Sequence, residues 1–342
     1  MRETETLLIV TEANEKVASG HLFECIVCYK ELVKKKREVH LMINADIPYK
    51  FRERLPQEYV EYPSDIQNDI PFLLKYIQKN HVSVIIFNLR KIENNFIRSL
   101  KRIADLQIVC IDEFGHRELD ADIIINPMVD QYYWKYENSN THLFCGSKYL
   151  ILSPEIVEYH SKEKIINEKV RVITVSMGGV DAPGTTVKLV KWMKEAGIAE
   201  QAHINLVLGG AFCYKDELWK EIANDEKFCV YQNISDIYEL FWQSDLAVCA
   251  GGNTLHELAA IGVPTIVIPS MPHEERNGKT FEEMGFSLCC DNALNVRKTD
   301  FLNSFIAIKD FEVRSNMSCK GKMISDGMGY RRVCDIIENM CL

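Results

Sequence analysis

The sequence lacks any apolar run close to the roughly 20 residues that a membrane-spanning helix needs. Residues 1–5 are too polar and acidic to begin a signal peptide. An excess of positive charge is missing as well, because the 342 residues carry a formal net charge of −9, which argues against a nucleic-acid partner. We therefore expect a cytoplasmic protein with no integral membrane segment and no nucleic acid among its partners.

Signals for disulfides, metals and other cofactors are missing too. The 12 cysteines do not have the spacing of a disulfide framework, and many lie within apolar strands. Cys25 and Cys28 form a C-x-x-C pair without a second pair of ligands nearby, which favours a structural role. The D-x-D sequence of Asp120 and Asp122 is typical of metal-dependent transferases of another fold, but here it directly precedes an apolar strand. We expect that neither a metal nor any other cofactor is needed.

The sequence does contain a regular alternation of apolar strands and helices, which is typical of doubly wound parallel sheets. A chain of this length is too long for one typical core, so we expect two such domains. The polar stretch 160–164 separates the two series of strands, and we place the domains at 1–160 and 161–342. Strands are expected at 7–11, 39–44, 82–89, 108–112, 123–125, 170–175, 204–208, 228–231, 246–250 and 265–269, and helices at 22–33, 70–79 and 94–103.

The most informative part of the chain is the stretch 248–264. It has the pattern of a buried strand that ends in Gly251 and Gly252, followed by a helix with Asn253 or Thr254 as its cap. Two glycines at such a junction let a phosphate approach the backbone, where N–H groups and the helix dipole favour negative charge. The stretch is therefore a prospective site for a nucleotide diphosphate.

Glu257 lies one helical turn further on, where its carboxylate can accept hydrogen bonds from the ribose hydroxyls. On the pattern alone, an ordinary strand–loop–helix unit with a solvated Glu257 is an equal alternative, because neither a P-loop nor a G-x-G-x-x-G motif is present. Glycine usage supports the site, since three glycine pairs each follow a predicted strand, at Gly178-Gly179, Gly209-Gly210 and Gly251-Gly252. Ligands bind at the carboxyl ends of parallel strands, so the second domain is the expected nucleotide-binding domain.

The run 250–264, Ala-Gly-Gly-x-Thr-x-x-Glu-Leu-x-x-x-Gly-x-Pro, resembles the nucleotide-binding signature of a group of GT-B-fold nucleotide-sugar enzymes. The group includes the UDP-sugar hydrolases of the pseudaminic acid pathway, the spore coat polysaccharide biosynthesis proteins similar to them, and the glycosyltransferase that makes the lipid-linked peptidoglycan precursor. Further stretches are similar to motifs of the pseudaminic-pathway hydrolases, at 18–22, 111–113, 120–127, 146–155, 175–181 and 275–277. The resemblance implies a GT-B-like α/β fold, with two Rossmann-like doubly wound parallel-sheet domains facing a cleft.

Three positions depart from the hydrolase motifs. Glu24 and Ser153 stand where the family has arginines, and Glu113 replaces the second aspartate of its Ile-Asp-Asp segment. An arginine can bind a carboxylate or a phosphate that Glu24 and Ser153 cannot, so we expect a different sugar substrate. These departures also leave open whether the protein has the same class of activity as the hydrolases.

His21 is the residue to which we assign the chemistry. It follows the first strand at the start of a helix, where the positive end of the helix dipole disfavours imidazolium and suits the neutral ring to a general base. The resemblance implies that this histidine activates water for attack at the anomeric carbon, with UDP leaving. The plain alternative is a histidine at a helix start that bonds a neighbouring carbonyl.

The other candidate residues divide between the sugar and the nucleotide. The resemblance assigns sugar binding to Gly20, Asp112, Glu113 and Asn277, and nucleotide binding to Gly178, Gly179, Gly251, Gly252, Asn253 and Glu257. For Asp112 and Glu113 a solvated or capping role is an open alternative. Asn277, at a helix start, can bind the phosphate in place of the sugar, or act as a cap. His256 is expected to pack or cap rather than to bind a ligand.

With this resemblance, three functions remain open. The first is a UDP-sugar hydrolase that releases an amino-deoxy sugar in the synthesis of a surface or coat glycan. The second is a glycosyltransferase of the same fold that passes the sugar to a glycan or lipid, and the third is a nucleotide-sugar binding protein without turnover. The amino-terminal domain has no glycine-rich acceptor loop, which favours the hydrolase. A UDP-sugar is the expected partner, and the sequence leaves the oligomeric state open.

Overall fold

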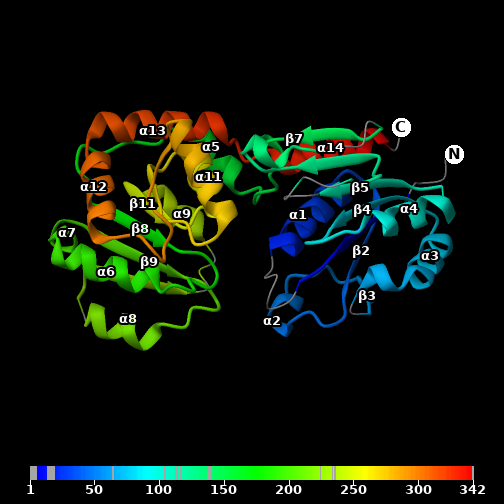
Figure 1. The fold of residues 1–342 in the computed structure, drawn as a ribbon, viewed down its shortest axis with the longest axis horizontal. Coiled ribbons are helices and arrows are strands. Elements are labelled where there is room, and N and C mark those ends of the chain that lie inside the picture. The colour runs from blue at the N-terminus through cyan, green and yellow to red at the C-terminus, as the bar shows by residue number, and fades with distance from the viewer. Residues whose placement is uncertain are drawn as a thin grey trace. The chain divides into compact units, whose positions relative to one another are not determined.

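The protein forms two compact units, each of them a layer of strands with helices on both sides (Figure 1). Unit 1 contains residues 1–154 together with 328–342, and unit 2 contains residues 155–327. The computed structural model describes residues 6–13, 20–63, 65–103, 105–111, 115, 118–136, 140–223, 225–232, 234 and 236–340.

Unit 1 is built on seven parallel strands in the order β3-β2-β1-β4-β5-β6-β7. The strands are β1 (Thr6–Thr11), β2 (Glu38–Asn44), β3 (Val60–Tyr62), β4 (Val82–Asn88), β5 (Gln107–Ile111), β6 (Ile123–Asn126) and β7 (His142–Cys145). The helices are α1 (Gly20–Lys34), α2 (Tyr49–Arg52), α3 (Ile70–Lys79), α4 (Asn94–Ile103) and α14 (Gly329–Met340), with 3₁₀ turns at Ile66–Asn68, Gln131–Tyr133 and Ser147–Tyr149. The strand order reverses between β1 and β4, which is the point of a doubly wound sheet where ligands bind.

Unit 2 is built on six parallel strands in the order β10-β9-β8-β11-β12-β13. The strands are β8 (Val172–Ser176), β9 (His203–Leu208), β10 (Phe228–Gln232), β11 (Leu246–Cys249), β12 (Thr265–Val267) and β13 (Ser287–Cys289). The helices are α5 (Ile156–Ser161), α6 (Thr185–Glu195), α7 (Ile198–Gln201), α8 (Lys215–Ile222), α9 (Ile237–Gln243), α10 (Asn253–Ile261), α11 (Pro272–Glu283), α12 (Lys298–Ile308) and α13 (Phe311–Ile324). Here the order reverses between β8 and β11.

The strand sequences explain why the sheets are parallel and covered on both faces. All six residues of β1 and all four of β11 are buried. A strand covered on both sides needs apolar residues at successive positions, whereas a strand with one wet face alternates. The helices cover these faces with one apolar stripe each, as α4 does with Phe96, Ile97 and Leu100.

Every strand expected from the sequence is present, and the expected class of two parallel-sheet α/β domains is confirmed. Three strands were not expected, namely β3, β7 and β13, which are all edge strands of three or four residues. An edge strand is paired on one side only and is kept short, so it leaves no long apolar run in the sequence. Asp112, expected as the last residue of a strand, lies outside the described residues.

The compact units divide the chain at 154/155, whereas the division that we expected, at 160/161, falls within α5. The larger difference concerns α14, which belongs to unit 1 although the sequence analysis placed it in the second domain. No local feature of the sequence predicts that the chain returns to unit 1 at α14, because the partners of α14 are far away in the sequence. Lys35 and Asp335, for example, are 300 positions apart.

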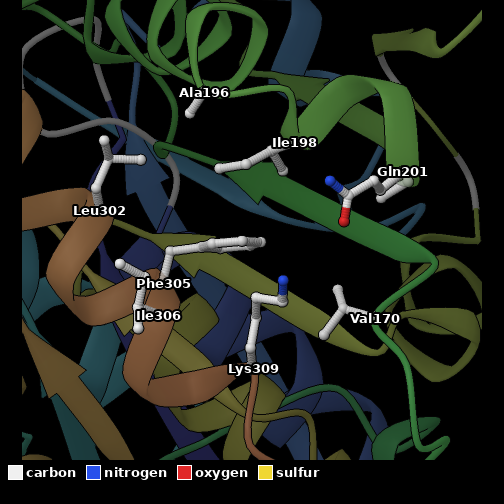
Figure 2. A pocket seen from close by; sticks show the side chains of 9 residues that line it. Val170, Ala196, Ile198, Gln201, Leu302, Phe305, Ile306 and Lys309 are labelled. Carbon is white, nitrogen blue, oxygen red and sulfur yellow. The ribbon is translucent and has the colours of Figure 1, made fainter.

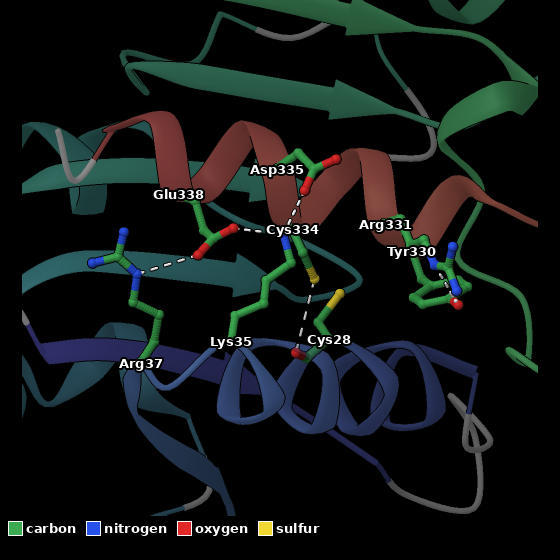
Figure 3. A network of polar contacts seen from close by, with 8 residues as sticks. All are labelled: Cys28, Lys35, Arg37, Tyr330, Arg331, Cys334, Asp335 and Glu338. Atoms are coloured by element: carbon green, nitrogen blue, oxygen red, sulfur yellow. Dashed lines mark hydrogen bonds and ion pairs between the residues drawn. The ribbon is translucent and has the colours of Figure 1, made fainter.

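Figure 3 shows how α14 lies along α1. Lys35 forms ion pairs with Asp335 and Glu338, and Glu338 also pairs with Arg37. Beside these ion pairs, α14 has an apolar side that contains Val333, Cys334 and Ile337, and all three side chains are fully buried. Such buried side chains stabilise the contact far more than the partly exposed ion pairs do.

We expect Ile337→Ala to lower the free energy of unfolding of unit 1 by about 2–5 kcal/mol, because it removes a fully buried side chain and leaves a cavity. Asp335→Ala, two residues earlier on the same helix, should cost less than about 1 kcal/mol, since the Asp335 side chain is 61% exposed. Urea unfolding followed by circular dichroism compares the two variants. Equal stabilities would contradict the assignment of α14 to the core of unit 1.

Candidate functional site

The turn after β11 requires glycine at its first position. Gly251 has a φ of +103°, and a Cβ placed there would lie 2.8 Å from the carbonyl oxygen of Glu274 at the start of α11. The side chain of Asn277, also on α11, donates from Nδ2 to the carbonyl oxygen of Gly251 at 3.2 Å. The turn is therefore held against α11 by backbone packing and by one buried amide.

The next residue, Gly252, is the cap of α10, so the expected caps Asn253 and Thr254 are wrong. Asn253 is the first helical residue, because Gly252 takes an extended conformation that ends the turn. Among the described residues no side chain caps this helix. The first N–H groups of α10 therefore remain available to an anion, where the helix dipole also favours negative charge.

Glu257 lies one turn into α10 and is partly buried. Burial raises the pKa of Glu257 to about 7, although hydrogen bonds from Tyr238 and Thr254 lower it. The hydroxyl of Tyr238 donates to Oε1 of Glu257 at 3.2 Å and so fixes the carboxylate in place. A carboxylate held in this way is suited to accept hydrogen bonds from a diol.

The other two glycine pairs stand beside this turn, because β8 pairs with both β9 and β11. A Cβ on Gly209 would lie 2.2 Å from the carbonyl oxygen of Gly179, so the loops after β8 and β9 touch through their backbones. The N–H of Ala211 donates to that same oxygen at 3.1 Å. A Cβ on Gly179 itself would meet no atom within 4 Å, which leaves open space on the outer side of this loop.

The aspartate of the loop after β8 has a structural role that the sequence analysis did not identify. Asp181 is buried, has a φ of +45°, and accepts hydrogen bonds from the N–H groups of Thr185 at 2.8 Å and Thr186 at 2.9 Å. These N–H groups open α6. The amino end of α6 is thus satisfied within the protein, unlike that of α10.

Asn277 and His256 lie in the interior of unit 2. Asn277 is only 4% exposed and is in the second turn of α11, so the capping role considered for it is wrong. Its Oδ1 is buried and has no hydrogen-bond partner among the residues that the structure describes, while Nδ2 positions Gly251. His256 packs edge-on against Phe281, as expected, with 4.8 Å between the ring centroids. Burial lowers the pKa of His256 to about 4.

In unit 1, His21 is the second residue of α1 and lies next to the carboxyl end of β4. Its Nδ1 is 2.7 Å from Oδ1 of Asn88, the last residue of β4. Nδ2 of Asn88 in turn donates to Oε2 of Glu24 at 2.8 Å. Gly20, the first residue of α1, is exposed and has open space where a Cβ would be.

Asn88 was not among the expected site residues, and Glu24 was expected only as the replacement of an arginine. Both are buried, with exposed fractions of 0% for Asn88 and 2% for Glu24. A weak signal was present, since Asn88 is a polar residue that ends an apolar strand, and Glu24 lies one turn after His21 on the buried side of α1. Two further candidates, Asp112 and Glu113, lie outside the described residues.

The D-x-D residues are engaged in ion pairs. Asp120 pairs with Arg98, and Asp122 pairs with Lys101 at 2.7 Å and accepts a hydrogen bond from the N–H of Ile108. In the described part of the chain, no group of three or more histidine, cysteine, aspartate or glutamate side chains is arranged to hold a metal ion. Likewise, no helix in these ranges is long and apolar enough to cross a bilayer.

An apolar pocket of about 220 Å³ lies in unit 2, away from the glycine turns (Figure 2). Apolar side chains of α7 and α12 line it, with the ammonium group of Lys309 and the amide of Gln201 at its edge. It contains none of the candidate residues.

Comparison with known proteins places this geometry in context. Residues 186–297 match the model of the glycosyltransferase family 28 C-terminal domain. The spore coat polysaccharide biosynthesis protein SpsG of Bacillus subtilis is 23% identical over 272 residues, which cover 79% of this chain and 80% of SpsG. A UDP-N-acetylglucosamine–N-acetylmuramyl-(pentapeptide) pyrophosphoryl-undecaprenol N-acetylglucosamine transferase of Acetivibrio thermocellus is 34% identical over 114 residues, or 31% of this chain and 30% of the transferase.

The solved structures agree on the fold. The crystal structure of MurG from Acinetobacter baumannii matches with a TM-score of 0.72 at 14% identity, covering 98% of this chain and 99% of that one. The chain therefore has the GT-B fold, and residues 186–297 are similar to the C-terminal domain of family 28 glycosyltransferases.

Proposed function

We propose that the protein is a UDP-sugar hydrolase that releases an amino-deoxy sugar from UDP. The observation that carries the proposal is the placement of His21, whose Nδ1 is hydrogen-bonded to a buried asparagine at the switch point of the unit 1 sheet. A histidine held by one ring nitrogen can present the other as a general base. The residues on the carboxyl edge of the unit 2 sheet supply the nucleotide-binding part of the proposal.

In the proposed reaction, Nε2 of His21 removes a proton from water as the water oxygen attacks the anomeric carbon. The bond between that carbon and the phosphate oxygen breaks, and UDP leaves with the electron pair. The N–H groups at the start of α10, with Gly251, Gly252 and Asn253, stabilise the charge that develops on the diphosphate. Gly178 and Gly179 give the diphosphate room, and Glu257 accepts hydrogen bonds from the ribose.

Sugar binding is proposed for Gly20, Asp112, Glu113 and Asn277. Gly20 supports this role through its exposed position beside His21, and Asn277 through its buried Oδ1, for which the described part of the chain offers no hydrogen-bond partner. A glycosyltransferase is the second candidate, because the family 28 model and the peptidoglycan-type relative both describe transferases. In that case His21 would remove the proton from an acceptor hydroxyl in place of water.

Incubation of the protein with a panel of UDP-amino sugars and no acceptor tests the proposal. We expect UDP to be released together with a free sugar, and ¹⁸O from labelled water to appear on the sugar, because attack at the anomeric carbon breaks the carbon–oxygen bond. Label on the UDP phosphate would refute this mechanism. Release of UDP only after addition of a glycan or lipid acceptor would establish the transferase instead.

Turnover is expected to persist in EDTA. The N–H groups of α10 can stabilise the leaving diphosphate, and the carboxylates of the D-x-D sequence are held by Arg98 and Lys101 rather than open to a metal. Initial rates with EDTA and with added magnesium or manganese give the comparison. Activity that is lost on chelation and restored by either metal would overturn this expectation.

A further inference from the structure

A buried polar chain links α1 to the carboxyl end of β4. The carboxylate of Glu24 accepts a hydrogen bond from Nδ2 of Asn88 at 2.8 Å, and Oδ1 of Asn88 lies 2.7 Å from Nδ1 of His21. Glu24 and Asn88 are almost completely buried, whereas the ring of His21 is partly exposed. We call these three residues the Glu24–Asn88–His21 relay.

The two ends of an asparagine amide differ, since Nδ2 only donates and Oδ1 only accepts. Oε2 of Glu24 accepts the hydrogen bond from Asn88, and Nδ2 is the end of the amide that can donate it, so Nδ2 lies on the side of Glu24. The opposite rotamer would place Oδ1 against the carboxylate, with two acceptors at hydrogen-bond distance in a buried site. Glu24 thereby fixes which end of the amide faces His21.

The direction of the amide then decides where the proton of His21 resides. Oδ1 can only accept, so Nδ1 of His21 carries the hydrogen that forms the 2.7 Å bond. A neutral imidazole with its hydrogen on Nδ1 has its lone pair on Nε2. The relay therefore selects the tautomer in which Nε2 is the base.

We propose that Glu24, acting through Asn88, is a positioning residue that fixes the Nδ1–H tautomer of His21. The inference deepens the proposed function, since it identifies what prepares the general base for a proton from water or from an acceptor hydroxyl. It also gives Glu24 a role at a position where the resembling motif has an arginine. An arginine at this position would only donate and would turn the amide of Asn88 the other way.

Two buried titratable groups in the described part of unit 1 have pKa values raised further above neutral pH. Burial raises the pKa of Cys25, beside Glu24 on α1, to about 12. Tyr62 donates its hydroxyl to the carbonyl oxygen of Thr11, and burial raises the pKa of Tyr62, an effect that Glu12, Asp46 and Asp65 strengthen. On the α14 side of α1, Asp335 and Glu338 are paired with Lys35.

The first test requires no substrate. Side-chain NMR of protein labelled with ¹⁵N-histidine distinguishes the two neutral tautomers, and the His21 signals are assigned by their loss in His21→Gln. We expect the Nδ1–H tautomer in the unmodified protein. Glu24→Met removes the obligatory acceptor, so it should populate the Nε2–H tautomer. The control is Glu31→Met, at a partly exposed position further along α1, and it should leave the His21 signals unchanged.

A double variant tests the direction of the relay. In Glu24→Met/Asn88→Asp the buried carboxylate moves from position 24 to position 88, where it can only accept from Nδ1–H of His21. The Nδ1–H tautomer should therefore return, with the number of carboxyl groups in the relay unchanged. Nε2–H in the unmodified protein, or a pure Nδ1–H signal in Glu24→Met, would overturn the proposal.

The second test measures turnover. Glu24→Met should lower kcat by about tenfold or more with little change in KM, because part of the enzyme holds the wrong tautomer. The double variant should recover kcat at high pH, and the acidic limb of its profile should lie at higher pH, since a carboxylate in contact with His21 favours imidazolium. A merely structural role for Glu24 predicts no such recovery. Absence of turnover in the unmodified protein would refute the proposed function, while the NMR test would still decide the relay.

Discussion

His21→Ala is expected to lower the kcat for UDP-sugar hydrolysis by roughly 10²–10⁴-fold, which is the usual contribution of a positioned general base. The affinity for UDP should stay almost unchanged, because the residues assigned to the nucleotide belong to unit 2 and His21 belongs to unit 1. Steady-state kinetics and calorimetry with UDP measure the two effects separately.

The matched control for this variant is His142→Ala. His142 is exposed and lies at the amino end of β7, whereas His21 is close to the carboxyl ends of the strands. The control should retain full activity. Full activity in His21→Ala would instead remove this residue from the chemistry and leave a binding protein or a different base as the explanation of the site.

Glu257→Ala should weaken UDP binding by about 1.5–3 kcal/mol, or roughly 10- to 150-fold, because it removes a charged acceptor for the ribose hydroxyls. The exposed Glu283, at the end of α11, provides the control, and Glu283→Ala should bind UDP normally. Calorimetry on both folded variants is the measurement. An unchanged affinity in Glu257→Ala would place the ribose elsewhere.

The same carboxylate predicts the pH dependence of binding. Since burial raises the pKa of Glu257 to about 7, the group is ionised above this pH and loses its charge as the pH falls. UDP affinity should therefore decrease from about pH 8 to pH 6. Glu257→Gln should show a flatter dependence, and titration of the UDP phosphate, which is common to both proteins, cancels in the comparison.

Much of the fold could be predicted from the sequence because the central strands are buried on both faces. β1 and β11 are continuous apolar runs, and such runs are recognisable without any knowledge of their partners. The edge strands β3, β7 and β13 could not be found in this way. The return of α14 to unit 1 was also out of reach, because its amphipathic pattern specifies a buried face but not the helix that buries it.

The residues of the candidate site also differ in whether the sequence predicts them. The glycines after β8, β9 and β11 were recognisable because close backbone approach and a positive φ restrict the residue type, as at Gly209 and Gly251. The partner of a polar side chain is decided by tertiary structure instead. For this reason Asn88 was missed, and Asn277 was placed at a helix start although it supports the turn at Gly251.

The position of α14 bears on the order in which the chain folds during synthesis. All of unit 2 is a continuous segment, and it leaves the ribosome before α14 does. Unit 1 comes first in the sequence, yet the surface of α1 that α14 covers, near Cys28, stays uncovered until α14 has been made. A domain usually folds as soon as its own residues have emerged, so in this protein the second unit can complete its fold before the first.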